Sequence, residues 1–355
     1  MPSHDPNSLG PTTFASVYLA CEKGARELLT TLGYVVVPAV RISSGVDPSV
    51  RFIGSHISVL KPHVIDPETL PSPGLAMLQQ CVRTRNLQTC LTGEGVPNWG
   101  STFPSLGILA PYVRLADVVN DARRCLMEVF EVTPADTMLR VSARDPDLLE
   151  IARAWEGGSL EIDTQSERYY QHFIGISDVS GRSFNIAIRL AGSDHFDDVG
   201  NIIVLQKKDC EAVVEVALGV TTILRQTSGS KHILDFSPAH GLFDGPEPIV
   251  RRLEDAIATT IVLFRDGVRP RADNRGRLLR VYLLSLALNA ARLRLSPDRL
   301  GAAIKEAAGR EPYLADVLVA EEICGSLDRL RTRLSNGVML NDQEKKVAAE
   351  LEASG

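Results

Sequence analysis

Six arginines fall within the segment FRDGVRPRADNRGRLLR, residues 264–280, directly before a strongly apolar run. They are Arg265, Arg269, Arg271, Arg275, Arg277 and Arg280, and only Asp266 and Asp273 accompany them. A guanidinium group can donate two parallel hydrogen bonds to phosphate oxygens, so this composition is suited to a phosphate backbone. The same arginines could equally form the charged, solvated rim of a helix–loop–helix, and both interpretations stay open at this point.

The charge of the whole chain is not that of a general nucleic-acid binder. The formal net charge is −6 at pH 7, whereas a protein that binds nucleic acid over a wide surface usually carries excess positive charge. The distribution is uneven, because residues 251–299 contain eleven arginines and five acidic residues. A basic face on an acidic protein indicates a localised partner that carries phosphate.

The cysteines and histidines show no metal-binding or disulfide pattern. Six cysteines are scattered without a CxxC pair, at positions 21, 81, 90, 125, 210 and 324. None of the seven histidines belongs to an HxxxH or HExxH pair, and a lone histidine is more often structural than a ligand. We therefore expect no structural zinc, no disulfide framework and a cytoplasmic location.

Length and composition are those of an ordinary globular protein with room for two or three domains. The chain has 355 residues, of which 44% are hydrophobic and 23% charged. Its first residues, MPSHDPNSLGPTT, lack the basic and apolar regions of a secretory signal, so we interpret residues 1–13 as a flexible tail. No apolar run is long enough to cross a bilayer, so no membrane partner is expected.

The periodicity of apolar residues predicts a mixed first part and a helical second part. Helices are expected over residues 14–34, 115–132 and 146–158, and strands over 35–42, 48–60, 75–87, 137–143, 184–192, 200–209 and 211–219. Residues 88–105 are rich in glycine, serine, threonine and proline, which predicts a turn or flexible loop. From about residue 249 the pattern is almost wholly helical. Residues 278–295 are apolar nearly all round, which indicates a helix buried in a bundle.

These elements predict an α+β fold. Residues 14–245 would form an antiparallel sheet flanked by helices, since the last three predicted strands are joined by short links. An all-helical domain follows over residues 249–340, after a boundary in the Pro/Gly-rich segment 236–248, and residues 341–355 form a C-terminal tail. The order of the elements, together with the lack of GxGxxG and GxxxxGK[ST] motifs, excludes Rossmann and P-loop folds.

Several segments, in the same order along residues 14–335, resemble the alanyl-tRNA synthetase family. The arginine-rich segment resembles the family's DGxxPxxxxRGxxLRR pattern, with Asp266-Gly267, Pro270, Asn274-Arg275-Gly276 and Leu279-Arg280 in place. DPSVRFIGSHISVLK (47–61) is similar to motif 1, including its lysine at Lys61, and QQCVR (79–83) is similar to motif 2. NIIVLQ (201–206) and EVALG (215–219) resemble the family's NIVFMQ strand and motif 3. FNIAIR (184–189) follows a Gly-Arg pair where the family has a turn rich in cysteine, glycine and proline and a carboxylate.

The resemblance implies a class II synthetase fold that binds ATP, alanine and the acceptor arm of a tRNA. It covers the family's catalytic domain and helical tRNA-recognition domain. The family's editing and C-terminal domains have no counterpart in the sequence, so we expect a truncated and divergent paralogue.

The resemblance also implies which residues would bind the nucleotide. Arg83 matches the motif 2 arginine, the expected catalytic cation on the α-phosphate, where charge builds during adenylation. Arg85 stands near a loop lysine of the family but could equally be a solvated residue. Phe103 could stack on the adenine or belong to the core. The family's glutamate that reads the adenine aligns with Pro104 or Ser105, neither of which can replace its carboxylate.

Glu215 takes the place of the motif 3 aspartate that holds the α-ammonium group of alanine. It is one methylene longer, so the amino acid would shift or differ, and Glu215 could instead be an outward-facing strand residue. Asn201 matches an asparagine that lines the substrate pocket, and Ala217 lies in the same motif 3 segment. In the helical domain, the resemblance favours contacts to tRNA phosphates by Arg269, Arg271, Arg275, Arg277 and Arg280 over a role as helix caps.

One departure from the family separates three functional hypotheses. Thr222 stands where the family has the arginine that holds the γ-phosphate of ATP, and Arg225, one helical turn on, could partly replace it. Without that arginine, the site fits tRNA-dependent transfer of alanine or a similar small amino acid to a nucleotide-like acceptor in the AMP position, as in natural-product biosynthesis. The alternatives are activation with ATP and Mg²⁺ before tRNA or another acceptor is aminoacylated, and a non-catalytic module that binds tRNA or an amino acid. The sequence leaves the oligomeric state open.

Overall fold

The computed structural model describes residues 11–207, 210–312, 318–337 and 340–354, and these form two compact units. The first, here called the sheet unit, contains Leu19–Cys81 and Phe103–Lys231. The second, here called the helical unit, contains Val82–Thr102 and the chain from His232 onward, and it also takes in the start of the first helix up to Tyr18. The division differs from the expected boundaries, because residues 82–102, residues 232–245 and the start of the first helix all group with the helical unit.

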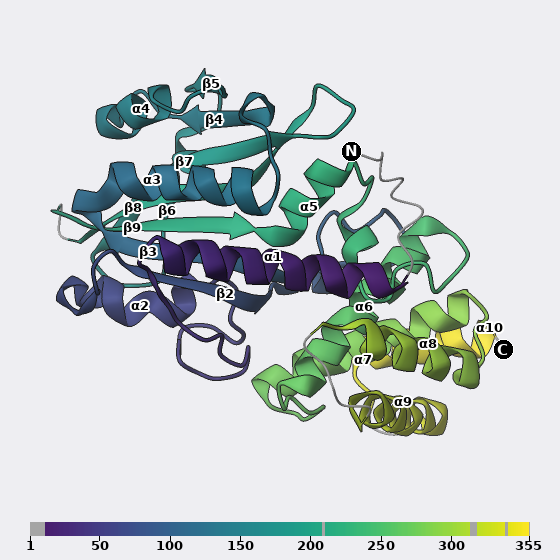
Figure 1. The fold of residues 1–355 in the computed structure, drawn as a ribbon. Coiled ribbons are helices and arrows are strands. Elements are labelled where there is room, and N and C mark those ends of the chain that lie inside the picture. The colour runs from purple at the N-terminus through teal and green to yellow at the C-terminus, as the bar shows by residue number, and fades with distance from the viewer. Residues whose placement is uncertain (1–10, 208–209, 313–317, 338–339, 355) are drawn as a thin grey trace. The chain divides into compact units, whose positions relative to one another are not determined.

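The sheet unit is built on one nine-stranded sheet (Figure 1). The strands run β1-β2-β3-β9-β8-β7-β4-β5 across the sheet, and β6 pairs with β7. Their bounds are β1 Val35–Val36, β2 Leu75–Val82, β3 Thr102–Pro111, β4 Thr137–Val141, β5 Ser159–Ile162, β6 Gln171–His172, β7 Val179–Arg189, β8 Phe196–Lys207 and β9 Cys210–Gly219. The central pairs β3–β9, β9–β8, β8–β7 and β7–β4 are antiparallel, whereas β1–β2 and β4–β5 are parallel.

Helices cover both faces of this sheet. They are α1 Pro11–Thr31, α2 Ile57–Ile65, α3 Leu115–Arg124, α4 Pro146–Arg153 and α5 Val220–Ser228. Side chains of α2 join a core cluster with Leu109, Ile203 and Val213, which share one face of the sheet because they lie opposite one another or two residues apart in the ladders. We call this the α2 face. Helix α1 packs on the other face, where Leu29 lies near Leu106 (Figure 1).

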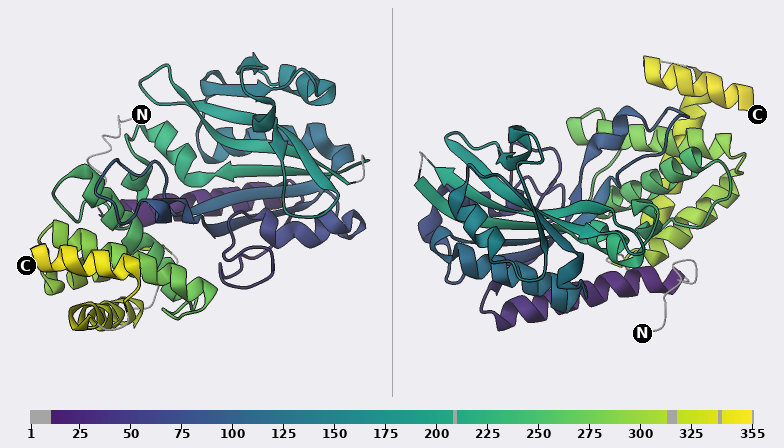
Figure 2. Two further views of the ribbon diagram at one scale, coloured as in Figure 1. Left: turned by 180° about the vertical axis from the view of Figure 1, so that it is seen from behind. Right: turned by 90° about the horizontal axis from the view of Figure 1, so that it is seen from above.

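The helical unit contains α6 Glu247–Arg265, α7 Asn274–Arg292, α8 Pro297–Arg310, α9 Leu318–Asn336 and α10 Asp342–Ser354; two further views show them with the twist of the sheet (Figure 2). The central α6 and α7 are almost entirely buried along their apolar runs. Asp273 caps α7 by accepting a hydrogen bond from the Gly276 backbone N–H at 2.6 Å. Among the described residues, no helix has both the length and the apolar character needed to cross a membrane.

The α+β fold expected from the sequence is confirmed, with a mainly antiparallel sheet, flanking helices and a helical region after it. The predicted strands over 75–87, 137–143, 184–192, 200–209 and 211–219 correspond to β2, β4, β7, β8 and β9, and the last three form the predicted meander. The helices expected over 14–34, 115–132, 146–158 and 278–295 are also present, as α1, α3, α4 and α7. In the expected tails, residues 1–10 and 355 lie outside the described residues, whereas 11–13 belong to α1 and 342–354 form α10.

Two strand predictions were wrong or too long. The strand expected over 35–42 is only β1, Val35–Val36. The strand expected over 48–60 is a turn followed by α2, in which Ile57, Leu60 and Val64 are buried. That spacing of three and four residues is helical, and the valine and isoleucine content of the segment concealed it. Asp47, ahead of α2, forms an ion pair with Lys61 of α2 at 2.6 Å, so the first and last residues of the motif 1-like segment are partners.

Candidate functional site

Four of the residues predicted to bind the nucleotide or amino acid share the α2 face. Glu215 lies between Ile203 of β8 and Leu109 of β3 in one row across the strands. The next row holds Asn185, Asn201, Ala217 and Gly107 on β7, β8, β9 and β3. Phe103 is the second residue of β3 and lies on the same face as Gly107 by strand alternation. The structure therefore brings Phe103, Asn201, Glu215 and Ala217 onto a common surface, and their roles as ligand contacts stay predictions.

Glu215 is buried and has a neighbour that the sequence did not predict. Its side chain is 2% exposed, and its Oε1 lies 3.1 Å from Nε2 of His56, which is 0% exposed. Nδ1 of His56 lies 3.0 Å from the Ser105 hydroxyl. The Oε2 atom of Glu215 is buried and has no hydrogen-bond partner among the described residues. The carboxylate thus keeps one acceptor oxygen for a donor that the described part of the chain does not supply.

Small residues make room for His56. A Cβ atom on Gly107 would lie 1.9 Å from Cδ2 of the His56 ring, so only glycine fits beneath the imidazole. Ala217, which pairs with Gly107 in the same row, also has a small side chain. A glycine inside a strand often marks a close approach of another group, and Gly107 in the strand-like segment SLGIL was the signal that could have pointed to this contact.

A second histidine, also missed from the sequence, lies on the same face. His172 pairs with Gly181 in the β6–β7 ladder, and its Nε2 lies 2.9 Å from the hydroxyl of Ser183, which shares the row of Glu215. Burial lowers the pKa of His172, and the negative charge of Glu215 opposes this in part. His172 is therefore a neutral imidazole at pH 7, able to accept a proton near the buried carboxylate.

Arg225, the residue expected to replace the missing γ-phosphate arginine, is engaged within the sheet unit. Its guanidinium donates to Oδ2 of Asp197 at 2.9 Å, and the same oxygen accepts a hydrogen bond from Gln226 at 2.7 Å. Burial acts against ionisation of Asp197, but the hydrogen bonds from Gln226, Arg225 and His195 lower its pKa below the ordinary value. The charge of Arg225 is thus balanced by a carboxylate that stays ionised at neutral pH.

Arg83 and Arg85 belong to the helical unit, in the loop that follows β2. Both are exposed. The backbone N–H of Arg83 donates to the Ser101 carbonyl at 2.8 Å, and the Arg85 guanidinium lies over the Trp99 ring, 5.3 Å from its centroid. Trp99 is 53% exposed, so this cation–π pair presents a flat surface to the solvent.

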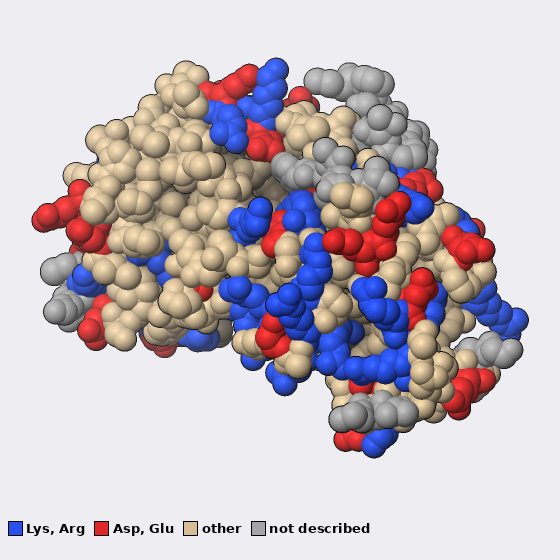
Figure 3. Space-filling model, turned by 90° about the horizontal axis from the view of Figure 1, so that it is seen from below, with Lys and Arg blue, Asp and Glu red and all other residues tan. Residues whose placement is uncertain are grey.

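The five arginines predicted to contact tRNA have different surroundings. Arg269 donates to the carbonyls of Phe264 and Val268 and pairs with Glu322 at 2.6 Å, so it caps α6. Arg280 pairs with the buried Glu344 of α10 at 2.6 Å. Arg271 and Arg277 are exposed and show no side-chain partner within the described ranges, and Arg275 is half-buried. In Figure 3, basic side chains gather in the middle of the face shown, with acidic ones between them.

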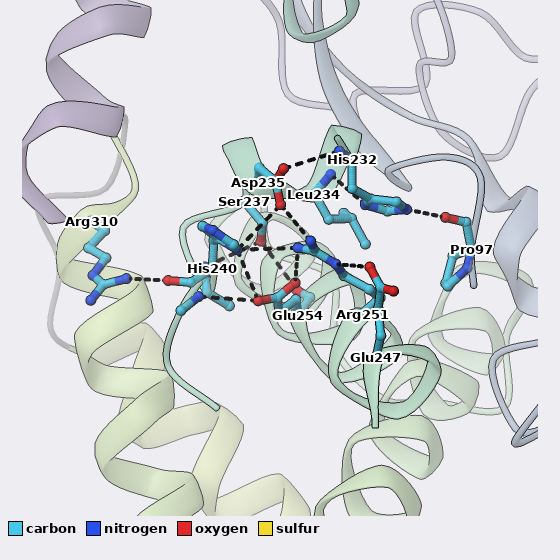
Figure 4. A network of polar contacts seen from close by, with 12 residues as sticks. Pro97, His232, Leu234, Asp235, Ser237, His240, Glu247, Arg251, Glu254 and Arg310 are labelled. Carbon is cyan, nitrogen blue, oxygen red and sulfur yellow. Dashed lines mark hydrogen bonds and ion pairs between the residues drawn. The ribbon is translucent and has the colours of Figure 1, made fainter. Parts of the chain in front are cut away.

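A polar network holds the segment that precedes α6 onto that helix (Figure 4). Arg251 donates to Asp235 at 2.6 Å and to the buried Glu254 at 3.0 Å. Glu254 also accepts from the backbone of Gly241 and lies 3.3 Å from His240. The network fixes residues 232–241 as a support for the helical unit rather than as a ligand site, because its carboxylates are already paired.

The described residues contain no cluster of three or more histidine, cysteine or acidic side chains that could hold a metal ion. Five cysteines, at positions 21, 81, 90, 125 and 324, form no disulfide within the described residues, and the side chain of Cys210 lies outside those residues. The chemistry of the α2 face therefore rests on a carboxylate, two imidazoles, amides and hydroxyls.

No protein-family model matches the chain, but solved structures with a related arrangement are aminoacyl-tRNA synthetases. A pyrrolysyl-tRNA synthetase from Desulfitobacterium hafniense has 11% identity and a TM-score of 0.38, over 61% of this chain and 70% of that one. Histidyl-tRNA synthetase from S. aureus has 9% identity and a TM-score of 0.37 over the same shares. Aspartyl-tRNA synthetase from Entamoeba histolytica has 10% identity and a TM-score of 0.41, over 64% and 58%. A likeness at this level concerns the arrangement of the chain, so activity and ligands are argued from this chain's own residues.

Proposed function

We propose that this protein transfers alanine or a similarly small amino acid from a charged tRNA to a nucleotide-like acceptor, without using ATP. In this reaction the ester bond between the aminoacyl carbon and the tRNA ribose oxygen breaks. The aminoacyl carbon bonds to an oxygen or nitrogen atom of the acceptor, and the acceptor's proton goes to the ribose oxygen. The ester is already activated, so the balance needs no further co-reactant.

The observation that carries this proposal is the environment of α5. A triphosphate needs a cation at its γ-phosphate, and Thr222 stands where the resemblance implies that arginine. The one arginine of α5, Arg225, has its charge balanced by Asp197 at 2.9 Å. Moving Arg225 to a phosphate would leave Asp197 without its cation, which makes Arg225 a poor substitute. Without a cation at the γ-phosphate, the binding of a nucleoside triphosphate is weakened more than the binding of a monophosphate.

The α2 face supports a small amino acid as the transferred group. The unpartnered Oε2 of Glu215 can accept a hydrogen bond from an ammonium group. Ala217 and Asn201 are half-buried neighbours in the next row, and the small side chain of Ala217 suits a pocket for a small amino acid. His172 is the candidate base for the acceptor's proton, since its imidazole is neutral.

The test uses alanyl-tRNA with AMP or a sulfamoyl adenosine as acceptor, in the absence of ATP. Loss of the tRNA ester together with an aminoacylated acceptor, identified by mass, is the expected result. Glu215→Gln should abolish transfer while tRNA binding is retained. Formation of product only with ATP and free alanine, with release of pyrophosphate, would instead establish amino-acid activation.

A second candidate, a non-catalytic binding module, has one observation in its favour. His56 occupies the space above Gly107 and approaches the buried Glu215 at 3.1 Å, so the protein fills part of the polar face itself. Under this alternative the protein would bind charged or uncharged tRNA, and no ester would be consumed in either assay.

A further inference from the structure

The loop of residues 83–101, which connects β2 to β3 and carries Arg83 and Arg85, is held by a buried carboxylate of α6. Oδ1 of Asp255 accepts a hydrogen bond from the Ser101 backbone N–H at 2.6 Å. Oδ2 accepts from the Ser101 hydroxyl at 2.7 Å and from the Asn86 amide at 2.9 Å. Asp255 is 4% exposed. One carboxylate therefore joins the beginning and the end of the loop.

These contacts lie next to the two arginines that the loop presents. The Arg83 N–H donates to the carbonyl of Ser101, whose own N–H donates to Asp255. Asn86 follows Arg85 directly, and its amide donates to the Trp99 carbonyl at 2.6 Å as well as to Asp255. Trp99 is the ring beneath the Arg85 guanidinium. Arg83 is thus hydrogen-bonded to Ser101, and Arg85 is next to Asn86 in the sequence. Both Ser101 and Asn86 donate hydrogen bonds to Asp255.

The middle of the loop is held separately by α6 and α7. Arg252 donates to the Thr89 carbonyl at 2.9 Å and to the Glu94 carbonyl. Ser285 and Asn289 both donate to the Cys90 carbonyl, and Arg292 donates to the Thr92 carbonyl at 2.9 Å. The loop therefore has enough other anchors to remain folded when the Asp255 contacts change, so its ends can be tested independently of its middle.

Packing alone does not explain an aspartate at this position, because both of its oxygens accept hydrogen bonds from the two ends of the loop. Burial raises the pKa of Asp255, and the hydrogen bonds from Ser101 and Asn86 oppose that effect. A carboxylate accepts from several donors at once, whereas an asparagine would turn an N–H₂ group toward a backbone N–H. Tyr282 of α7 extends the set by donating to the Ser101 hydroxyl at 3.0 Å. These hydrogen bonds orient the two ends of the loop.

We infer that Asp255 is a positioning residue that fixes the orientation in which the 83–101 loop presents Arg83 and Arg85. This inference rests on the proposed function for the identity of the ligand. It adds that α6 of the helical unit positions the two arginines proposed to bind the nucleotide. Helix α7 carries Tyr282, Ser285 and Asn289, and also three of the arginines proposed to contact tRNA, Arg275, Arg277 and Arg280. The anchors of the loop and part of the proposed tRNA surface thus share helix α7.

The test compares Asp255→Asn with Thr260→Val, a control on the same helix. Thr260 is buried, and its hydroxyl has no partner among the described residues, so its removal leaves the loop contacts intact. For D255N we expect amide hydrogen exchange in residues 83–101 to speed up about tenfold, the upper end of the effect of losing one buried hydrogen bond. Iodide quenching of the exposed Trp99 should change in parallel, and AMP affinity should fall. T260V should behave as the wild type in all three measurements.

Ser101→Ala serves where D255N does not fold, because it removes one hydroxyl donor and keeps the backbone contact. It should speed exchange in the same residues by a smaller factor. Exchange and quenching that stay at the wild-type level in either folded variant would overturn the inference. Hydrogen exchange and Trp99 quenching need no ligand. If the wild type failed to bind AMP, that result would count against the proposed function, and the exchange and quenching data would still test the positioning role of Asp255.

Discussion

At the scale of single residues, the contact between His56 and the sheet shows how one glycine permits a polar cluster. Gly107 leaves space for the imidazole, and the imidazole lies near Glu215 and Ser105. His56 lies inside the motif 1-like segment but has no counterpart in a histidine motif, and Gly107 lies in no motif-like segment. A lone histidine and a strand glycine are both common, so neither pointed to a contact with Glu215, which is distant in sequence from both.

The first prediction concerns this contact. Gly107→Ala would place a methyl group against three ring atoms of His56 at 1.9–2.4 Å, so we expect a decrease of about 1–3 kcal/mol in unfolding free energy from overpacking. His56→Ala should relieve the clash, so that the double variant is more stable than the sum of the two single decreases implies. Urea unfolding measures this. Gly24→Ala in α1, where the new methyl meets Val129 at an ordinary 3.5 Å, is the control; strict additivity would contradict the packing argument.

The second prediction concerns pH. Burial acts against ionisation of Asp47, but the hydrogen bonds from Lys61 and Ser49 lower its pKa below the ordinary 3.8. A lowered pKa in the folded state means that the ionised form contributes stability above pH 3.8 and that this contribution is lost as pH falls toward the folded value. Asp47→Asn should therefore reduce stability at pH 7 by about 1.5–3 kcal/mol, with a gap to wild type that narrows below pH 4. Asp66→Asn, an exposed change nearby, should show no gap; a pH-independent gap for D47N would refute the ion-pair explanation.

At the scale of elements, helix α7 combines buried and exposed roles that its sequence pattern only partly separates. Its apolar run is buried as predicted, but the arginines around its N-terminus divide into two kinds. Arg280 is committed to Glu344 of α10, whereas Arg277 and the preceding Arg271 face the solvent. Glu344 lies 64 residues further along the chain, so no local pattern could have assigned it to Arg280.

The third prediction separates these two kinds of arginine. The double variant Arg271→Ala/Arg277→Ala should weaken tRNA binding and reduce the slope of log affinity against log salt by about one unit for each phosphate that an arginine no longer neutralises. Its unfolding free energy should stay unchanged, because neither side chain has a partner in the described structure. Arg280→Ala should instead lower stability, since it removes a cation from the buried Glu344. Lys345→Ala, an exposed charge on α10, controls for net charge; an unchanged salt slope in the double variant would exclude these arginines from the RNA surface.

The elements also show what the sequence could and could not predict. Strands β7, β8 and β9 were predictable because apolar runs with short links specify a meander. Helix α2 was misread as a strand, since its isoleucine and valine residues favour strands locally, and only packing on Leu109 and Ile203 selects the helix. The rows that bring Asn201, Ala217 and Glu215 together depend on strand register, which a single sequence does not fix before the ladders are known.

At the scale of the whole molecule, the grouping of residues 82–102 with the helical unit changes how the chain is divided. The chain leaves the sheet after β2, is held by α6 and α7, and returns at β3, so a sequence boundary near residue 240 describes only the second crossing. A contiguous fragment that ends there would contain the loop without Asp255, Arg252 or Asn289. Its loop carbonyls and the Asn86 amide would lack the partners that hold them in the full chain.

The fourth prediction uses this division. The chain has two tryptophans, with the buried Trp155 in the sheet unit and the exposed Trp99 in the helical unit. In a Trp99→Phe background, Trp155 emission should report a lower urea midpoint for D47N, because that variant breaks an ion pair of the sheet unit. In a Trp155→Phe background, Trp99 emission should report a lower midpoint for Glu344→Gln, which weakens the contacts of Arg280 and Arg333 to α10. Each variant should leave the other probe unchanged. Equal shifts of both probes would instead show that the two compact units unfold in one cooperative transition. The stability of the 83–101 loop would then depend on the sheet unit as well as on α6.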